Sequence, residues 1–389
     1  MRNADWKLIL VAVVAAAVAC AQEAQKAQYT QEGPFWVRTY TREAAAHTRL
    51  IVSARAKIVL RGGSDSHVVY KVVQRVRART EAQARRQMPD AMGFFDFPGD
   101  VTRLVVVPLG AAVASQVEIY VPRQTTVVSL ESQGGDIEAY DFDGSIDAAT
   151  MYGQIRCDRI SGSVGARTGG GEIHLGKIGG AIRCSSGAGA VYVDSAGGET
   201  NCATAGGDML VQEAWGPLLL STEGNIRVGK AASSVEAHSS AGIIEVGSAG
   251  GAVNADTRGG SIQIGSARGV RAESAQGGVR IKTGSGPMSI SAAAGSILAE
   301  LLPGTRLENS TLASGLGDIT VLIPSNVAVT IMARNDSNGP APIISDFREI
   351  HMQTRLIQSP LSAQGAIHGG GPVLFINAAA GVIYLRKTK

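Results

Sequence analysis

Apolar positions recur every nine residues over most of the middle of this chain, from about residue 134 to residue 300. Each repeat has the form Gly-x-(Ile/Val)-x-apolar, and its anchors run from Ile137 to Ile297. Of 19 anchors, 15 are Ile or Val and 17 have glycine two residues earlier. Only two steps between anchors are shorter, each by one residue. A nine-residue spacing kept over this length of chain indicates a repeat architecture, with one strand and one turn in each unit.

Successive units alternate in the residue two positions after the anchor. One type carries a large side chain there, as at Leu175 and Val193, and the other a small one, as at Ala166 and Cys184. Side chains alternate along a strand, so the anchor and this residue share a face. The sequence therefore predicts an all-β fold, a single-stranded parallel β-solenoid of about 18-residue coils with two nine-residue half-coils each. Large residues on one wall would pack against small ones on the other.

Two further sets of equivalent positions recur with the same spacing, and each would stack into a column along the solenoid. Glycine before each anchor is expected to let the turn adopt positive φ. Four residues after the anchor, the small-residue half-coils carry a hydroxyl column: Thr150, Thr168, Ser186, Thr204, Thr222, Ser239, Thr257 and Ser274. An outward threonine array would suggest ice binding, but this position is in phase with the core. We therefore expect an inward ladder whose hydroxyls satisfy backbone groups of the turns.

The chain divides by pattern into four segments. Residues 1–19 form a predicted signal peptide, 22–125 a β-rich N-terminal segment, 126–300 the solenoid, and 301–389 its C-terminal continuation and cap. The β-rich ends are expected to cap the sheet, because an open edge invites pairing between molecules.

One short helix is expected in the N-terminal segment, at Thr80–Met88, with Thr80 as its N-cap and Pro89 ending it. Basic residues surround it: Lys71, Arg75, Arg77, Arg79, Arg85 and Arg86. We interpret them as a solvated face, with contact to anionic lipid or polysaccharide as the alternative.

The N-terminus predicts export to the cell envelope, either the periplasm or the outer surface. Arg2 and Lys7 precede the apolar run Leu8–Ala19, which is too short to span a bilayer. Cys20 follows at once, so cleavage before it and acylation of its thiol would tether the protein to a membrane. Lipoprotein signals usually carry leucine three residues before the cysteine, and Ala17 stands there. Lipidation at Cys20 and free secretion both stay open.

Three cysteines remain after such processing: Cys157, Cys184 and Cys202. Cys184 and Cys202 lie one coil apart in the same inward column, near disulfide range. We expect two reduced, buried thiols here, because adjacent parallel strands rarely orient a pair for bonding. Cys157 belongs to the opposite wall.

Composition and motifs point away from catalysis. The formal net charge of +3 does not indicate a nucleic-acid partner. The sequence has no nucleophile elbow, zinc-protease motif, P-loop or Cys-x-x-Cys, and its six histidines are scattered. We therefore expect no catalytic residues, no metal site and no cofactor. A carbohydrate-active solenoid enzyme is the less favoured alternative, since the outward columns carry no acidic cluster.

One irregularity marks a candidate contact patch. Between Thr200 and Leu220 the anchor positions carry threonine, methionine and leucine in place of Ile or Val. Tyr192 and Leu210 become outward neighbours one coil apart, Trp215 lies in a nearby turn, and Leu219 lies on the other wall. Outward apolar neighbours on a polar surface can mark a contact site. The alternative is that a terminal segment folds over them.

Several phrases together carry a family resemblance. These are the running Gly-(Asp/Ser/Glu)-Ile, the later Gly317-Asp318-Ile319, the Ser345-Asp346-Phe347, and the closing Gly-x-Ile-x-Gly-Gly-Gly and Gly-Val-Ile-x-Leu-Arg of residues 365–371 and 381–386. In these the chain resembles the bacterial putative-adhesin β-solenoid family. The resemblance implies a surface or envelope β-solenoid with an adhesive role and brings no catalytic residues.

The function expected from the sequence is therefore a non-enzymatic envelope adhesin or structural binding scaffold. Its ligand would be an envelope or extracellular polysaccharide or protein. The alternative is a self-assembling envelope scaffold, whose copies associate with one another.

Overall fold

The computed structural model describes residues 28–63, 66–88, 92–97, 100–106, 113–123, 125–304, 307–337, 342–353 and 361–388. The predicted signal peptide and Cys20 lie outside these residues. The chain divides into two compact units, residues 1–168 and 169–389. The described residues form strands and a single short helix, which confirms the all-β prediction.

The elements of the first unit are β1 (Gln28–Glu32), β2 (Phe35–Ala44), β3 (Arg49–Ala54), β4 (Lys57–Gly63), β5 (Val68–Arg77), α2 (Glu81–Gln87), β6 (Met92–Phe97), β7 (Val101–Val106), β8 (Val113–Pro122), β9 (Val127–Ser132), β10 (Ile137–Phe142), β11 (Ser145–Thr150), β12 (Ile155–Ile160) and β13 (Val164–Thr168).

The strands of the second unit are β14 (Ile173–Ile178), β15 (Ile182–Ser186), β16 (Val191–Ala196), β17 (Thr200–Thr204), β18 (Met209–Ala214), β19 (Leu218–Thr222), β20 (Ile226–Ala231), β21 (Val235–Ser239), β22 (Ile244–Ala249), β23 (Val253–Thr257), β24 (Ile262–Ser274), β25 (Val279–Ala292), β26 (Ile297–Glu300), β27 (Ser310–Ser314), β28 (Ile319–Pro324), β29 (Val329–Asn335), β30 (Ile343–Ser345), β31 (His351–Gln353), β32 (Leu361–Ile367), β33 (Val373–Ala378) and β34 (Ile383–Thr388).

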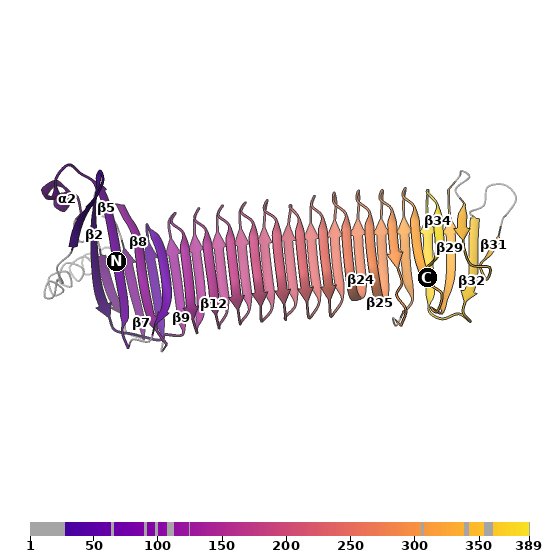
Figure 1. Ribbon diagram of the computed structural model, residues 1–389, viewed down its shortest axis with the longest axis horizontal. Coiled ribbons are helices and arrows are strands. Elements are labelled where there is room, and N and C mark those ends of the chain that lie inside the picture. Colours follow the sequence, from indigo (N-terminus) through magenta and orange to yellow (C-terminus); the bar gives the residue numbers. More distant parts are fainter. Residues whose placement is uncertain are drawn as a thin grey trace, which may run out of the picture. The chain divides into compact units, whose positions relative to one another are not determined.

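Parallel stacking at the predicted spacing builds the second unit (Figure 1). Ile173 pairs with Val191, and Val191 with Met209, at steps of 18 residues. After the first shortened turn, Met209 pairs with Ile226, a step of 17. We call the wall containing β14, β16, β18, β20 and β22 the first wall, and that containing β15, β17, β19, β21 and β23 the second wall. This register confirms a parallel β-solenoid with 18-residue coils.

The interior is filled by large side chains on the first wall and mostly smaller ones on the second. On the first wall, Val193 and Val211 are each 1% exposed. On the second, Cys202 is 1% exposed and Ala237 is fully buried. One coil alone could not bury these faces, so stacking supplies the hydrophobic burial that stabilises each coil.

The turn glycines are required by close stacking between coils. A Cβ on Gly189 would lie 2.0 Å from the carbonyl oxygen of Gly171, and one on Gly207 would lie 2.3 Å from that of Gly189. Neither glycine has a positive φ. The prediction that these glycines serve positive φ is therefore wrong at both positions, whereas Gly286, before the anchor Met288, does have a positive φ of 77°. Each turn lies directly on the turn below at a strand-to-strand spacing of about 4.8 Å, which leaves no room for a side chain.

The hydroxyl column forms the predicted inward ladder. In the second unit, Thr204 Oγ1 donates to the Gly189 carbonyl oxygen at 2.9 Å and accepts from the Gly207 N–H at 3.4 Å. In the first unit, Thr150 does the same between Gly135 and Gly153. Both threonines are buried. The prediction is confirmed, and the ladder satisfies turn groups that would otherwise be buried without partners.

The first unit begins with strands that pair out of sequence order. β3 lies between β7 and β9, and β4 between β8 and β10, all in parallel. β5 then pairs antiparallel with β8, β2 pairs antiparallel with β5, and β6 pairs antiparallel with β7. These antiparallel strands form a β-rich cap that differs in pattern from the parallel coils.

The predicted helix is confirmed as α2, which packs beside the β2–β5 pair. Thr80 is its N-cap, and its Oγ1 accepts from the Gln83 N–H at 3.3 Å. Ala84 and Met88 form a buried cluster with Val76, and Trp36 packs against it. Pro89 lies outside the described residues.

The second unit closes with the same kind of inserted strands. β33 lies between β27 and β29, and β34 between β28 and β30. β32 then pairs antiparallel with β29, and β31 with β32. The chain thus returns from β29–β32 to place its final two strands inside the stack, which makes the predicted β-rich C-terminal cap.

Candidate functional site

The outward column of the first wall carries an apolar interruption in the second unit. His174, Tyr192 and Leu210 occupy neighbouring coils in direct register. The next residues in the column are Arg227 and Glu245, which form an ion pair at 2.8 Å. The structure therefore places Tyr192 and Leu210 side by side on the solvent face of this wall, next to charged coils.

Tyr192 is held by a stacked ring that the sequence interpretation did not use. The His174 and Tyr192 ring centroids lie 4.6 Å apart with planes 20° from parallel. His174 Nε2 lies 2.9 Å from Glu172 Oε2, which fixes the imidazole ring. Tyr192 and Leu210 are both half-buried, because each is covered on its coil-facing sides by its neighbours. Offset or stacked ring pairs of this kind contribute about 0.5–1.5 kcal/mol beyond area burial.

Trp215 is the most exposed member of the candidate patch, with 57% of its surface exposed. The backbone N–H of Trp215 donates to the Ala196 carbonyl oxygen at 2.9 Å, and the backbone N–H of Ala232 donates to the Ala214 carbonyl oxygen at 2.8 Å. The same turn position is glycine at 197 and alanine at 232, so the indole ring is flanked by coils with almost no side chain. The Lys230 ammonium lies 5.9 Å from the ring centroid.

The four predicted patch residues do not form one continuous surface. Trp215 lies five residues after Leu210, about 15 Å along the strand direction. Leu219 lies on the second wall, 37% exposed, in register with Asn201 and Glu236. We therefore leave out Leu219 and define the Tyr192 patch as His174, Tyr192 and Leu210, together with Trp215, which follows β18 on the same wall. The periodicity that places His174 one coil before Tyr192 was the available signal for its inclusion.

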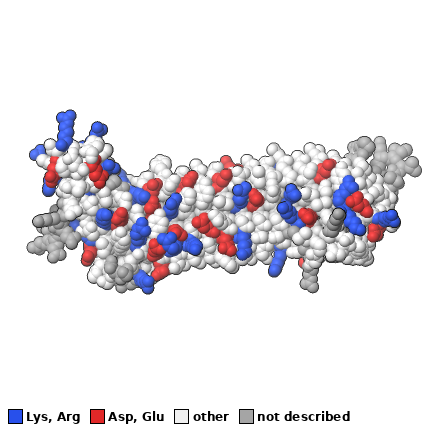
Figure 2. All heavy atoms as spheres, in the orientation of Figure 1, with Lys and Arg blue, Asp and Glu red and all other residues white. Residues whose placement is uncertain are grey.

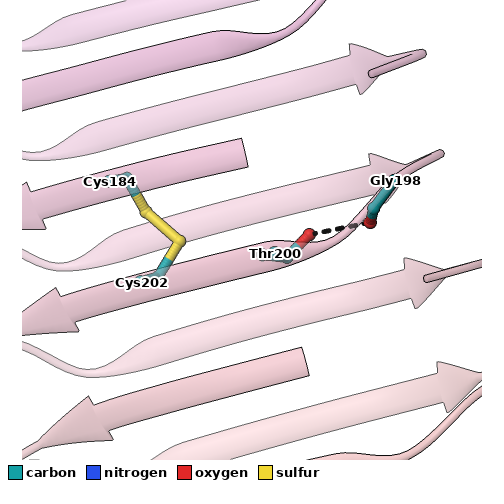
Figure 3. The surroundings of a disulfide bond; sticks show 4 residues. All are labelled: Cys184, Gly198, Thr200 and Cys202. Atoms are coloured by element: carbon teal, nitrogen blue, oxygen red, sulfur yellow. Dashed lines mark hydrogen bonds between the residues drawn. A yellow bond between two sulfur atoms is a disulfide. The ribbon is translucent and has the colours of Figure 1, made fainter. Parts of the chain in front are cut away.

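Cys184 and Cys202 form a disulfide bond between adjacent coils of the second wall (Figure 3). The expectation of two reduced thiols is therefore wrong. Residues in direct register on neighbouring strands bring the two Cα atoms to 4.6 Å, within the range that a disulfide spans. Both half-cystines are buried.

Cys157, in the first unit, is a free and fully buried thiol. Burial raises the pKa of this thiol to about 12, because the apolar interior disfavours the thiolate. The thiol is therefore unreactive at neutral pH.

The described residues include no group of three or more His, Cys, Asp or Glu side chains placed to hold a metal ion. His174 pairs with Glu172 on the first wall, and His238 with Glu236 on the second. The same part of the chain contains no helix with the length and apolarity needed to cross a membrane.

One shallow hollow lies elsewhere, on the outer face of β29, β32 and β33. Its volume is about 300 Å³, and Met332, Gln364 and Phe375 line it. Met332 and Phe375 are neighbours in register, 43% and 45% exposed. The sequence pattern missed this pair, because β33 stands next to β29 only through the out-of-order insertion.

Comparisons with known proteins give a remote likeness only. No protein-family model and no curated protein matches the chain. A crystal structure of a putative cell adhesion protein from Clostridium sporogenes ATCC 15579 is 8% identical, with a TM-score of 0.19 over 90% of this chain and 100% of that one. A putative adhesin from Bacteroides fragilis NCTC 9343 is 10% identical, with a TM-score of 0.18 over 90% and 97%. These values are too low to assign a function to this chain.

Proposed function

We propose that this protein is an exported, non-enzymatic envelope adhesin whose coils are a scaffold and whose first wall binds an envelope or extracellular polymer. The Tyr192 patch is the binding surface. One observation carries the proposal: a stacked His174–Tyr192 pair with Leu210 beside it interrupts an outward column that continues with charged residues. Apolar neighbours exposed on a polar surface commonly mark contact sites.

The chemistry of the patch suits a polysaccharide or a peptide segment. Aromatic side chains offer large apolar area together with a polar edge, which favours them at interfaces. Tyr192 on β16 and Trp215 in the turn after β18 supply two such groups on neighbouring coils. Near Trp215, Glu213 at the end of β18 pairs with Lys230 at 3.4 Å. An extended polymer could touch both aromatic side chains and hydrogen-bond to the charged pair near Trp215.

Export is supported by the buried disulfide. Structural disulfides persist in oxidising compartments and are rare where thiols are kept reduced. A cystine in the interior of two stacked coils fits a protein that folds outside the cytosol. The predicted signal peptide before Cys20 supports the same location, with or without acylation of that cysteine.

A non-enzymatic role is supported by the state of the acidic groups near the patch. Glu172 is paired with His174, and Glu213 with Lys230. Most glycoside hydrolases use a pair of carboxyl groups that flank the scissile bond of the substrate. Glu172 and Glu213 lie in different coils, and each is paired with a basic residue.

A pull-down with envelope and matrix polysaccharide fractions tests the proposal. The Tyr192→Ser, Leu210→Ser, Trp215→Ser variant is expected to bind about 150-fold more weakly, since each of the three lost contacts costs on the order of 1 kcal/mol. The matched control is Ile243→Ser, Leu316→Ser, which removes two residues that are 44% and 68% exposed and lie in turns away from the patch. The control should bind as the unmodified protein does.

Retention of binding by the patch variant, or equal loss in the control, would contradict this assignment of the surface. No retention of any fraction by the unmodified protein would contradict the adhesin proposal itself. Concentration-dependent light scattering would then test the self-assembling scaffold, and release of reducing sugar would test the carbohydrate-active enzyme.

A further inference from the structure

Positive charge is concentrated in the part of the chain that forms the N-terminal cap. Residues 28–88 contain 12 Lys and Arg but only four Asp and Glu, a formal charge of +8. Residues 89–389 contain 21 Lys and Arg against 27 Asp and Glu, a formal charge of −6. The small net charge of the whole chain therefore hides a strongly basic module on an acidic remainder.

The fold places several of these charges on exposed positions of one strand and the segment that follows it. Along β5 the side chains alternate, so Val72, Gln74 and Val76 are buried while Arg75 and Arg77 are exposed. Arg79 follows in the turn before α2, and Arg86 lies in the last turn of the helix; both are exposed. Figure 2 shows Lys and Arg side chains projecting around α2, with fewer acidic ones among them.

Only part of this charge is neutralised within the module. Arg85 pairs with Glu81 at 2.6 Å, Lys71 with Glu118 at 3.5 Å, and Arg75 with Glu32 at 3.7 Å. Within the described residues, Arg77, Arg79 and Arg86 have no ion-pair partner. Three exposed guanidinium groups are thus available to an anionic partner.

Aromatic rings pack against two neighbouring arginines of the module. The Arg75 guanidinium lies over the Phe35 ring, 4.4 Å from its centroid, and that of Arg85 lies 4.3 Å from the Tyr29 centroid. Arginine stacked on an aromatic ring keeps its remaining N–H groups directed to a ligand. Basic residues interleaved with half-buried aromatic residues are typical of surfaces that lie against lipid headgroups.

The position of this module along the chain favours a membrane over a soluble polymer. β1 begins at Gln28, eight residues after Cys20 and nine after the apolar run Leu8–Ala19. Eight residues span at most about 28 Å. Any form of the protein held in a bilayer by an acyl group on Cys20 would therefore keep the basic module close to the headgroups.

We propose that the module formed by β1, β2, β5 and α2 docks on an anionic phospholipid surface through Arg77, Arg79 and Arg86. A single acyl chain gives only marginal membrane binding, and a nearby basic patch supplies the second contribution that stable anchoring needs. Each basic residue near an anionic leaflet contributes enough to raise the binding constant about fivefold. The docking is independent of the Tyr192 patch.

Co-sedimentation with vesicles tests the docking without any lipid anchor. The chain from Ala21 onward contains every described element and lacks both the apolar run and Cys20. It is expected to bind vesicles of equal parts phosphatidylglycerol and phosphatidylcholine in low salt, to be released in high salt, and not to bind phosphatidylcholine alone. Arg77→Gln, Arg79→Gln, Arg86→Gln should weaken binding about 100-fold.

The matched control is Arg183→Gln, Arg258→Gln, Arg280→Gln, which removes the same charge from exposed positions of the second unit. It should bind vesicles nearly as the unmodified chain does. Equal loss in this control, undiminished binding by the module variant, or binding to neutral vesicles would overturn the proposal. Binding to soluble polygalacturonate with no binding to anionic vesicles would also overturn it and point to an acidic polysaccharide.

Discussion

Gly207→Ala is expected to destabilise the protein by about 2–3 kcal/mol, although it adds only one methyl group. That methyl carbon would lie 2.3 Å from the Gly189 carbonyl oxygen and 2.4 Å from its carbonyl carbon. Both atoms belong to backbone of the coil below, so a side-chain movement cannot relieve the clash. The turns would have to separate, with loss of the parallel hydrogen bonds beside them. The change in the free energy of unfolding can be measured by urea denaturation.

Gly206→Ala is the matched control, one residue away in the same turn. A Cβ there would meet only the Ala188 carbonyl oxygen, at 3.9 Å, and Gly206 does not have a positive φ. This substitution should be neutral or stabilise by about 0.5 kcal/mol, because alanine has less freedom in the unfolded chain. Equal effects at positions 206 and 207 would contradict the stacked-turn geometry.

The second large effect is expected from the disulfide. Replacing both Cys184 and Cys202 with alanine should lower the free energy of unfolding by about 3 kcal/mol, since the bond closes a loop of 18 residues and restricts the unfolded chain. Urea denaturation with and without a reductant measures this contribution. The reductant should lower the stability of the unmodified protein and leave the double variant unchanged.

Cys157→Ala separates the cross-link from the loss of buried sulfur. Cys157 is fully buried and unbonded, so this variant creates a similar small cavity without breaking a bond. It should cost about 1 kcal/mol and should not respond to reductant. A double variant no less stable than Cys157→Ala would show that the two cysteines are not bonded in solution.

The coils could be predicted from the sequence because each residue's place in a solenoid follows from its phase. Tyr192 and Leu210 are 18 residues apart, and the structure pairs them directly. The same arithmetic placed Thr204 in the interior, where it joins the turn of Gly189 to that of Gly207. A translational repeat turns sequence spacing into spatial neighbourhood, so periodicity alone was sufficient there.

The caps could not be predicted in this way. β3 and β4 each lie between two strands that come later in the sequence. β33 and β34 each lie between two strands that come earlier in the sequence. Such pairings join segments whose separation matches no period. The exposed Met332–Phe375 pair depends on one of them and has no counterpart in the sequence pattern.

For two sets of residues the position was predicted correctly, but the role of the glycines and the bonding of the cysteines were not. Gly189 and Gly207 were assigned to positive φ, whereas backbone contact with the coil below excludes their Cβ atoms. Cys184 and Cys202 were placed as neighbours but expected to stay reduced. In both cases the column was predicted correctly, and the distance between coils, which the sequence does not contain, decided the outcome.

Amide hydrogen exchange on the protein bound to the polymer fraction it retains tests the central claim most directly. The account predicts slower exchange on binding in β16, in β18 and in the turn at Trp215, with no change in the C-terminal strands β29–β34 or in the second-wall strands. Protection confined to β29, β32 and β33, or spread evenly over all coils, would contradict the assignment of binding to the Tyr192 patch.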